Sequence, residues 1–204
     1  MRVSKEKAAE NRQDILTAAA RLFREQGVSA TGVDSITKDV SLTHGAVYSH
    51  FGSKEAIAAE AIHFAFQGSQ RLWQRLAERK GAKKAFPAIV AKYLSREHRD
   101  SPGQGCVVAA LGADVARQPQ SVREAFTEEF KDALEFLAGV MPGEDPSRRY
   151  EDAIAAFASM AGALTLARAV NDETLSDRIL HITAKRMIQR TNVRGPARRT
   201  KGIH

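Results

Sequence analysis

The sequence predicts an all-α fold with a short three-helix region at the N-terminus and a larger helical region after it. Apolar residues recur at the three- and four-residue spacing of amphipathic helices along almost the whole chain. Alternating runs of β-branched residues bounded by turns, the pattern of strands, do not occur. Near the N-terminus, two short helical segments follow a longer one and are separated by a turn of only a few residues.

Composition limits the classes of protein that the chain can represent. Its 204 residues fit one or two domains of about 100–200 residues, and the 43% of hydrophobic residues allows a core. No apolar run reaches the roughly 18 residues of a transmembrane helix, so no membrane partner is expected. The opening "MRVSKEKAAENRQD" lacks the apolar segment of a signal peptide. Cys106 is the only cysteine, which excludes an intrachain disulfide and favours the cytoplasm.

The net charge of +7 is concentrated at the C-terminal end. Residues 1–55 hold 8 Lys/Arg and 7 Asp/Glu, residues 56–184 hold 16 and 17, and residues 185–204 hold 7 and 0. The high charge therefore does not by itself indicate a basic DNA-binding face in the N-terminal region.

Helix-capping residues divide the N-terminal region. Ser4 is expected to cap a first helix that ends at Gly27. Thr31 is expected to cap a second helix, with Asp34 in its first turn, that ends near residue 40. Ser41-Leu42 forms a tight turn.

Thr43 then caps a third helix, which runs to Phe51 and is ended by Gly52. Ser53 caps a fourth helix, with Glu55 in its first turn. This spacing is specific for a helix-turn-helix.

The phase of the third helix indicates its role. Val47 and Phe51 fall on one face and point inward, while Gly45, Tyr48 and Ser49 fall on the opposite face. Recognition helices meet base edges mainly with their N-terminal residues, here Thr43 and His44. The Tyr48 hydroxyl, the amides at the helix N-terminus and Lys54 can reach phosphates.

Chemical alternatives for the same segment have weak support. His44 and His50 are six residues apart and about 120° out of phase, with no third ligand nearby, which argues against a metal pair. The triplet His98–Asp100 has the letters of a kinase catalytic loop, but Gly105 stands where that loop needs Asn. No nucleophile has a recognisable partner, so neither an enzyme nor a cofactor is expected.

The segment "ILTAAARLFREQGVSATGVDSITKDVSLTHGAVYSHFGSKEAI" resembles the N-terminal domain of the TetR (tetracycline-repressor-like) transcriptional regulators. The matching residues keep the family's order and spacing: Ala19, Leu22, Phe23, Gly27, Thr31, Ile36, Gly45, Tyr48, Phe51 and Lys54. The resemblance implies a homodimer that binds a palindromic operator in double-stranded DNA. The DNA-facing set that it indicates is Thr31, Thr43, His44, Gly45, Tyr48, Ser49, His50 and Lys54.

Two positions depart from the family pattern, and both lie in or next to the second helix. Ser41 stands where the family often has Gly in the turn, and it would be strained if the turn needs a positive φ. Thr37 stands where Ala is common. Neither departure blocks the fold.

The resemblance divides the chain into a DNA-binding domain (residues 1–55, reading head about 31–54), an effector-binding and dimerisation domain (56–190) and a basic tail (191–204). A largely apolar small-molecule effector is implied, with candidate contacts at Phe64, Trp73, Tyr93, Leu111, Phe126, Phe130, Phe157 and Met160. Each of these residues is also explained as plain core. Small residues in "AIAAFASMAGALTLARA" suggest dimer contacts at Ala158, Ala161 and Leu164, or simply close packing within one subunit.

The sequence thus favours a ligand-responsive transcriptional regulator, most simply a repressor released by its effector. An architectural DNA-binding protein that binds through its basic tail is the alternative. Cys106 has no Lys, Arg or His within four residues, so we expect a buried and inert thiol rather than a redox sensor.

Overall fold

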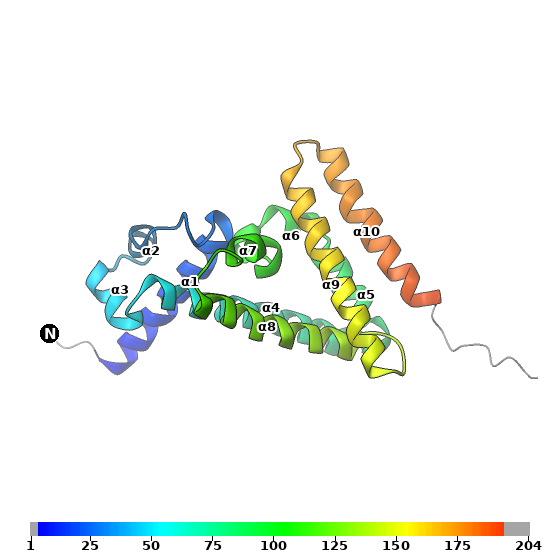
Figure 1. The fold of residues 1–204 in the computed structure, drawn as a ribbon, viewed down its shortest axis with the longest axis horizontal. Coiled ribbons are helices and arrows are strands. Elements are labelled where there is room, and N and C mark those ends of the chain that lie inside the picture. Colours follow the sequence, from blue (N-terminus) through cyan, green and yellow to red (C-terminus); the bar gives the residue numbers. More distant parts are fainter. Residues whose placement is uncertain (1–3, 194–204) are drawn as a thin grey trace, which may run out of the picture. The chain divides into compact units, whose positions relative to one another are not determined.

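The computed structural model describes residues 4–193, and over this range the chain forms helices and no strands (Figure 1). The predicted all-α fold is confirmed. The helices are α1 (Lys5–Gln26), α2 (Val33–Val40), α3 (His44–Phe51), α4 (Lys54–Lys80), α5 (Ala82–Tyr93), α6 (Arg96–Asp100), the 3-10 helix η1 (Pro102–Gln104), α7 (Val107–Val115), α8 (Gln120–Val140), α9 (Pro146–Ala169) and α10 (Glu173–Val193).

The helices form two compact units that are not contiguous in sequence. One unit combines the described residues up to 74 with residues 96–133, and the other combines residues 75–95 with the described residues from 134 onward. The first unit therefore contains α6, η1 and α7 in addition to the three N-terminal helices. The boundary expected at residues 55 and 56 falls inside this unit, at the start of α4.

Local capping determines the ends of α1. The Ser4 hydroxyl accepts a hydrogen bond from the Lys7 amide at 3.2 Å, as expected for an N-cap. Gly27 has a φ of 88° and its N–H donates to the Phe23 carbonyl at 2.7 Å. The apolar face between these caps buries Ile15, Ala19 and Phe23. Both predicted ends of this helix are confirmed.

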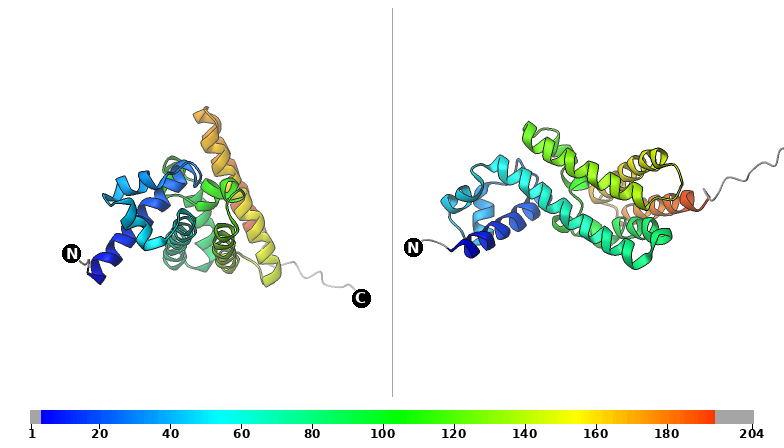
Figure 2. Two further views of the ribbon diagram at one scale, coloured as in Figure 1. Left: turned by 60° about the vertical axis from the view of Figure 1, so that its left-hand side comes forward. Right: turned by 90° about the horizontal axis from the view of Figure 1, so that it is seen from below.

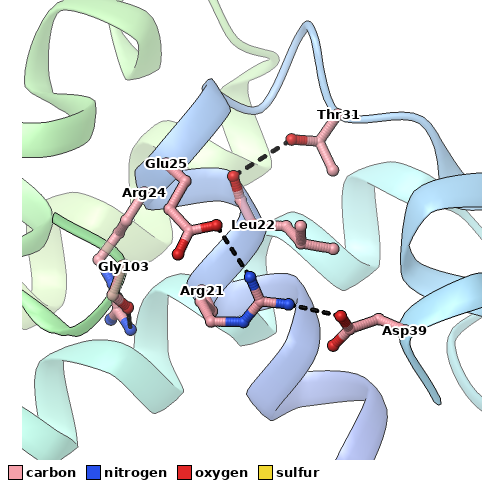
Figure 3. Close-up of polar contacts among 7 residues, drawn as sticks. All are labelled: Arg21, Leu22, Arg24, Glu25, Thr31, Asp39 and Gly103. Carbon is pink, nitrogen blue, oxygen red and sulfur yellow. Dashed lines mark hydrogen bonds and ion pairs between the residues drawn. The ribbon is translucent and has the colours of Figure 1, made fainter. Parts of the chain in front are cut away.

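The start of α2 differs from the prediction. Gly32, not Thr31, is the N-cap, and no side chain caps the helix. Thr31 is 0% exposed, and its hydroxyl donates to the Gly27 carbonyl at 2.7 Å. The same hydroxyl lies 3.4 Å from the Leu22 carbonyl oxygen (Figure 3). The hydroxyl therefore bonds to backbone carbonyls at the end of α1 instead of capping the start of α2.

The turn after α2 has the geometry of a Schellman motif. Ser41 has a φ of 54°, and the Leu42 N–H donates to the Thr37 carbonyl at 3.0 Å. Ser41 is the only non-glycine residue with a positive φ among those described. The left-handed backbone conformation considered from the sequence is therefore present, and it favours glycine at this position.

Helices α1, α2 and α3 pack on one another, and both views of Figure 2 show them grouped together in blue to cyan. The end of α1 also contacts η1 and α7. Arg24 donates from Nε to the Gly103 carbonyl at 2.8 Å, and the Val28 N–H donates to Asp114 Oδ2 at 2.6 Å. Burial lowers the pKa of the Arg24 guanidinium to about 10. The segment 100–105, which contains η1, thus forms part of the contact surface for α1.

In the second unit, α9 and α10 lie side by side, and α5 contacts α10 (Figure 1). Phe86, Phe157 and Met160 are fully buried there. The buried Ser176 hydroxyl donates to the Ala167 carbonyl at 2.6 Å and connects α10 to the end of α9. Within residues 4–193, no helix combines the length and apolarity that crossing a bilayer requires. Most of the predicted basic tail, residues 194–204, lies outside the described residues.

Candidate nucleic-acid interface

Two apolar side chains anchor the inner face of helix α3. Val47 and Phe51 are buried, as their helical phase predicts. The Arg12 guanidinium of α1 lies over the Phe51 ring at 4.8 Å from its centroid, and Arg12 also forms an ion pair with Glu60 of α4. Helices on both sides therefore fix the inner face of α3.

Both ends of α3 are capped as predicted. The Thr43 hydroxyl accepts from the Ala46 amide at 3.2 Å. At the other end the Gly52 N–H donates to the Tyr48 carbonyl at 2.8 Å. These caps restrict α3 to the eight residues His44–Phe51, about two turns, a length that suits insertion into a groove.

The outer face of α3 is exposed and carries no acidic residue. Thr43, His44, Gly45, Tyr48 and Ser49 are exposed. Gly45 has open space around the position that a Cβ would take. The Ser49 hydroxyl donates to the Ala46 carbonyl at 2.7 Å. This face presents small residues flanked by His44 and Tyr48, whose ring centroids are 6.1 Å apart.

The other three residues of the expected DNA-facing set are less exposed to solvent. Thr31 is fully buried, so its side chain is not on this surface, which corrects the expectation. His50 is half-buried, with its ring centroid 6.3 Å from that of Phe51. Lys54 is half-buried, and its Nζ donates to the Ser29 carbonyl at 3.2 Å.

One polar partner on α2 was not anticipated. His44 Nε2 forms a hydrogen bond with Asp34 Oδ1, and their side chains are 48% and 89% exposed. The sequence places Asp34 in the first turn of α2, where an acid is explained by the helix dipole alone. Only the packing of α2 on α3 shows the contact.

The candidate effector contacts fall into both units. In the first unit, the rings of Phe126 and Phe130 stack with centroids 5.9 Å apart, and Phe66 meets Phe126 edge-on at 5.6 Å. Trp73 and Leu111 are buried and Phe64 is half-buried. In the second unit, Tyr93 meets Phe157 edge-on at 6.1 Å, and Met160 is fully buried.

A polar contact between α4 and α8, the two helices that carry the first aromatic cluster, was missed. Gln67 Nε2 lies 2.6 Å from His63 Nε2, and His63 Nδ1 contacts the buried carboxylate of Glu129. The i,i+4 spacing of His63 and Gln67 around Phe66 on α4 was the available signal. Its partner Glu129 comes from α8 and could not be assigned from spacing.

The three residues expected as dimer contacts on α9 differ in their exposure to solvent. Ala158 is exposed, whereas Leu164 is 0% exposed and Ala161 is almost fully buried. Leu164 packs inside its own subunit, which corrects its assignment as a dimer contact.

Cys106 is buried, as expected. Its amide donates to His98 Nε2 at 2.9 Å, so a histidine lies close in space although it is distant in sequence. Over the described ranges, no three His, Cys, Asp or Glu side chains gather as metal ligands.

The two short helices α2 and α3, packed on the longer α1, have the arrangement of a helix-turn-helix DNA-binding protein. Residues 15–61 match the family model for bacterial regulatory proteins of the tetR family. An HTH-type transcriptional regulator of Mycobacterium tuberculosis that has not been characterized is 25% identical over 177 residues, 81% of this chain and 88% of its own. The regulator AcrR of Shigella flexneri is 46% identical over 59 residues, 29% of this chain and 27% of its own.

The fold of the remainder is also similar to solved structures. A TetR transcriptional regulator from Legionella pneumophila superposes with a TM-score of 0.76 at 22% identity, over 94% of this chain and 100% of its own. Residues 15–61 are thus a DNA-binding region of the TetR type, and the curated proteins that the chain resembles are transcriptional regulators rather than enzymes.

Proposed function

We propose that this protein is a repressor that binds a palindromic operator as a homodimer and is released by a small-molecule effector. The observation that carries the DNA-binding part is the exposed face of α3, a helix with no acidic residue of its own, above the buried Val47 and Phe51. A regulator of this kind works where the DNA is, in the cytoplasm.

On this face, the N-terminal residues Thr43 and His44 are assigned to base edges, because recognition helices read bases from that end. Gly45 and Ser49 let the helix backbone approach closely. The Tyr48 hydroxyl, the amides at the helix N-terminus and Lys54 are assigned to phosphates, which set the register on the duplex. To contact a phosphate, Lys54 Nζ gives up its hydrogen bond to the Ser29 carbonyl. His50 stays at the edge of the interface.

The proposed dimer surface is the exposed face of α9 together with exposed apolar residues of α10. Between residues 154 and 169 every exposed residue of α9 is uncharged: Ile154, Ala155, Ala158, Ser159, Gly162, Thr165, Leu166 and Ala169. Leu166 is 58% exposed, and Leu175 and Ile182, seven residues apart on α10, are also exposed. Large exposed apolar side chains on an uncharged face indicate a partner, and a second copy fits the two-fold symmetry of a palindrome.

The effector is proposed to be a largely apolar molecule that binds against aromatic side chains of the protein. The support is the cluster of Phe66, Phe126 and Phe130, with His63 and Glu129 on the same two helices as polar groups that could fix orientation. The other candidate contacts are kept, with Trp73 and Tyr93 preferred because each has a polar atom on an apolar ring. The effector would favour a conformation whose two α3 helices no longer match half-sites about 34–36 Å apart.

Binding to the promoter region of its own gene tests the proposal. We expect a sequence-selective complex whose affinity falls with salt concentration, and release by an effector that also changes the fluorescence of Trp73, the only tryptophan. Absence of any sequence-selective complex would refute the DNA-binding part.

The architectural alternative rests on the basic tail. Deleting residues 194–204 separates the two proposals, because a tail-driven architectural protein loses nearly all of its binding. A regulator that binds through α3 keeps most of its binding to the operator.

A further inference from the structure

The contact between Asp34 and His44 joins the two helices of the reading head. His44 is the first residue of α3, and its Nε2 pairs with Oδ1 of Asp34 in the first turn of α2. Both side chains lie at the surface, so the pair is on the face proposed to meet DNA. The geometry of this pair decides which ring nitrogen of His44 can form a hydrogen bond with a base.

The two nitrogens of an imidazole have different hydrogen-bonding roles. A carboxylate only accepts hydrogen bonds, so the ring nitrogen that faces it carries the proton. With Nε2 protonated and held by Asp34, Nδ1 is the ring atom left for another partner, and in the neutral ring it is an acceptor. In the major groove an acceptor matches the amino groups of adenine and cytosine.

We propose that Asp34 is a positioning residue for sequence recognition, which fixes the orientation and the protonated nitrogen of His44 so that His44 distinguishes one base pair in each half-site. This inference rests on the proposed DNA interface. A histidine free to rotate and to exchange its proton between nitrogens presents a donor or an acceptor to the same base edge, which weakens discrimination. The pair removes that freedom before DNA is bound.

The other acid of α2, Asp39, offers a comparison. Asp39 pairs with Arg21 of α1 at 2.5 Å and so holds α2 to its scaffold rather than to α3. Replacing either acid with alanine removes one negative charge from α2. Only the Asp34 change releases His44, so Asp39→Ala is a matched control for the electrostatic effect.

The test is a binding selection from operator libraries in which each half-site position is randomised in turn. It compares the wild type with Asp34→Ala, Asp34→Asn, His44→Ala, the double variant Asp34→Ala/His44→Ala and Asp39→Ala. Thermal melts show that each variant is folded. Since one mismatched pair changes affinity roughly fivefold or more, loss of preference at a single position is measurable.

We expect His44→Ala and Asp34→Ala to lose preference at the same position, and the double variant to be no worse than His44→Ala. Asp34→Asn keeps an oxygen that accepts from Nε2 and should retain the preference. Asp39→Ala should retain every preference. The non-additivity identifies coupling between the two residues.

Three results overturn the inference. Asp34→Ala could raise affinity for all sequences alike with preferences intact, which would make Asp34 only a repulsive charge. It could change preference at a position other than that of His44, which would make Asp34 a base-reading residue itself. The two single effects could also add in the double variant. If His44→Ala changes no preference, the proposed reading role of His44 fails instead.

Discussion

Arg21 of α1 donates a hydrogen bond to Asp39 of α2 at 2.5 Å, and its other terminal nitrogen donates to Glu25 at 2.8 Å (Figure 3). The hydrogen bond to Asp39 raises the pKa of the Arg21 guanidinium, so the guanidinium stays charged at any ordinary pH. Through this contact the supporting helix holds the first helix of the reading head.

The Arg21–Asp39 pair should contribute little to stability. More than a third of each side chain is exposed, and exposed pairs contribute about 0.2–1 kcal/mol. We expect Asp39→Ala to lower the free energy of unfolding by roughly this amount, as measured by urea denaturation at low salt. The loss should shrink at high salt, which screens exposed charges. A loss several times larger would show that the pair is essential to the fold.

Gly103 should not tolerate a side chain. A Cβ at this position would lie 2.9 Å from Arg21 Cγ and would also meet the carboxylate of Glu25. We expect Gly103→Ala to destabilise the protein by about 1–2 kcal/mol, because the side chains of α1 must shift.

Gly112 is the matched control for this change. It lies in α7 with open space at its Cβ position, so Gly112→Ala should stabilise by up to about 1 kcal/mol through helix propensity. Equal effects of the two substitutions in denaturant melts would contradict the packing of η1 on α1.

The positive φ of Ser41 predicts that glycine is better at this position. We expect Ser41→Gly to raise the free energy of unfolding by about 0.5 kcal/mol, since it relieves a left-handed backbone conformation of a residue with a Cβ. Ser49→Gly, in the middle of α3, should lower it by up to about 1 kcal/mol. Chemical denaturation compares the two, and destabilisation by Ser41→Gly would argue against the observed turn.

The exposed face of α9 predicts a charge-sensitive dimer. Leu166→Lys should shift the protein toward monomer in sedimentation equilibrium, because it buries a lysine in the proposed two-fold interface. Leu72 of α4 is exposed as well but lies outside that face, so Leu72→Lys serves as the control. If both variants keep the wild-type oligomeric state, the dimer surface lies elsewhere.

Local sequence predicted the reading head well where local interactions decide the structure. The caps of α1 and α3 are the residues that were expected to end these helices: Ser4, Gly27, Thr43 and Gly52. Such caps bond to backbone groups a few residues away, so their effect is visible in the sequence. The phase of Val47 and Phe51 was predicted for the same reason.

Thr31 shows where the local pattern was insufficient. A threonine before a helix suggests an N-cap, but its hydroxyl instead bonds to the carbonyl of Gly27 in the preceding turn. Burial against α1 decided between the two partners. The hydrogen bond between Asp34 and His44 was missed similarly, because it depends on how α2 packs on α3.

On α9 the sequence could not distinguish the two faces. Small residues occur on both sides of the helix: Ala153 and Ala163 are buried, while Ala158 and Gly162 are exposed. Leu164, an apolar residue in a run of small ones, was therefore assigned to the wrong side. Exposure of Leu166 distinguishes the faces, and it follows only from the packing of α9 on α10 and the rest of its unit.

The most direct test of α3 as the DNA-reading helix is a fluorescence anisotropy titration. It compares the wild type, His44→Ala and Tyr48→Phe on a duplex from the protein's own promoter region and on a scrambled duplex, at salt concentrations from about 50 to 200 mM. We expect the wild type to prefer the promoter duplex, His44→Ala to lose part of that preference, and Tyr48→Phe to bind both duplexes more weakly by about the same factor. Identical behaviour of the two variants would contradict the assigned roles, and absence of any preference in the wild type would contradict recognition by α3.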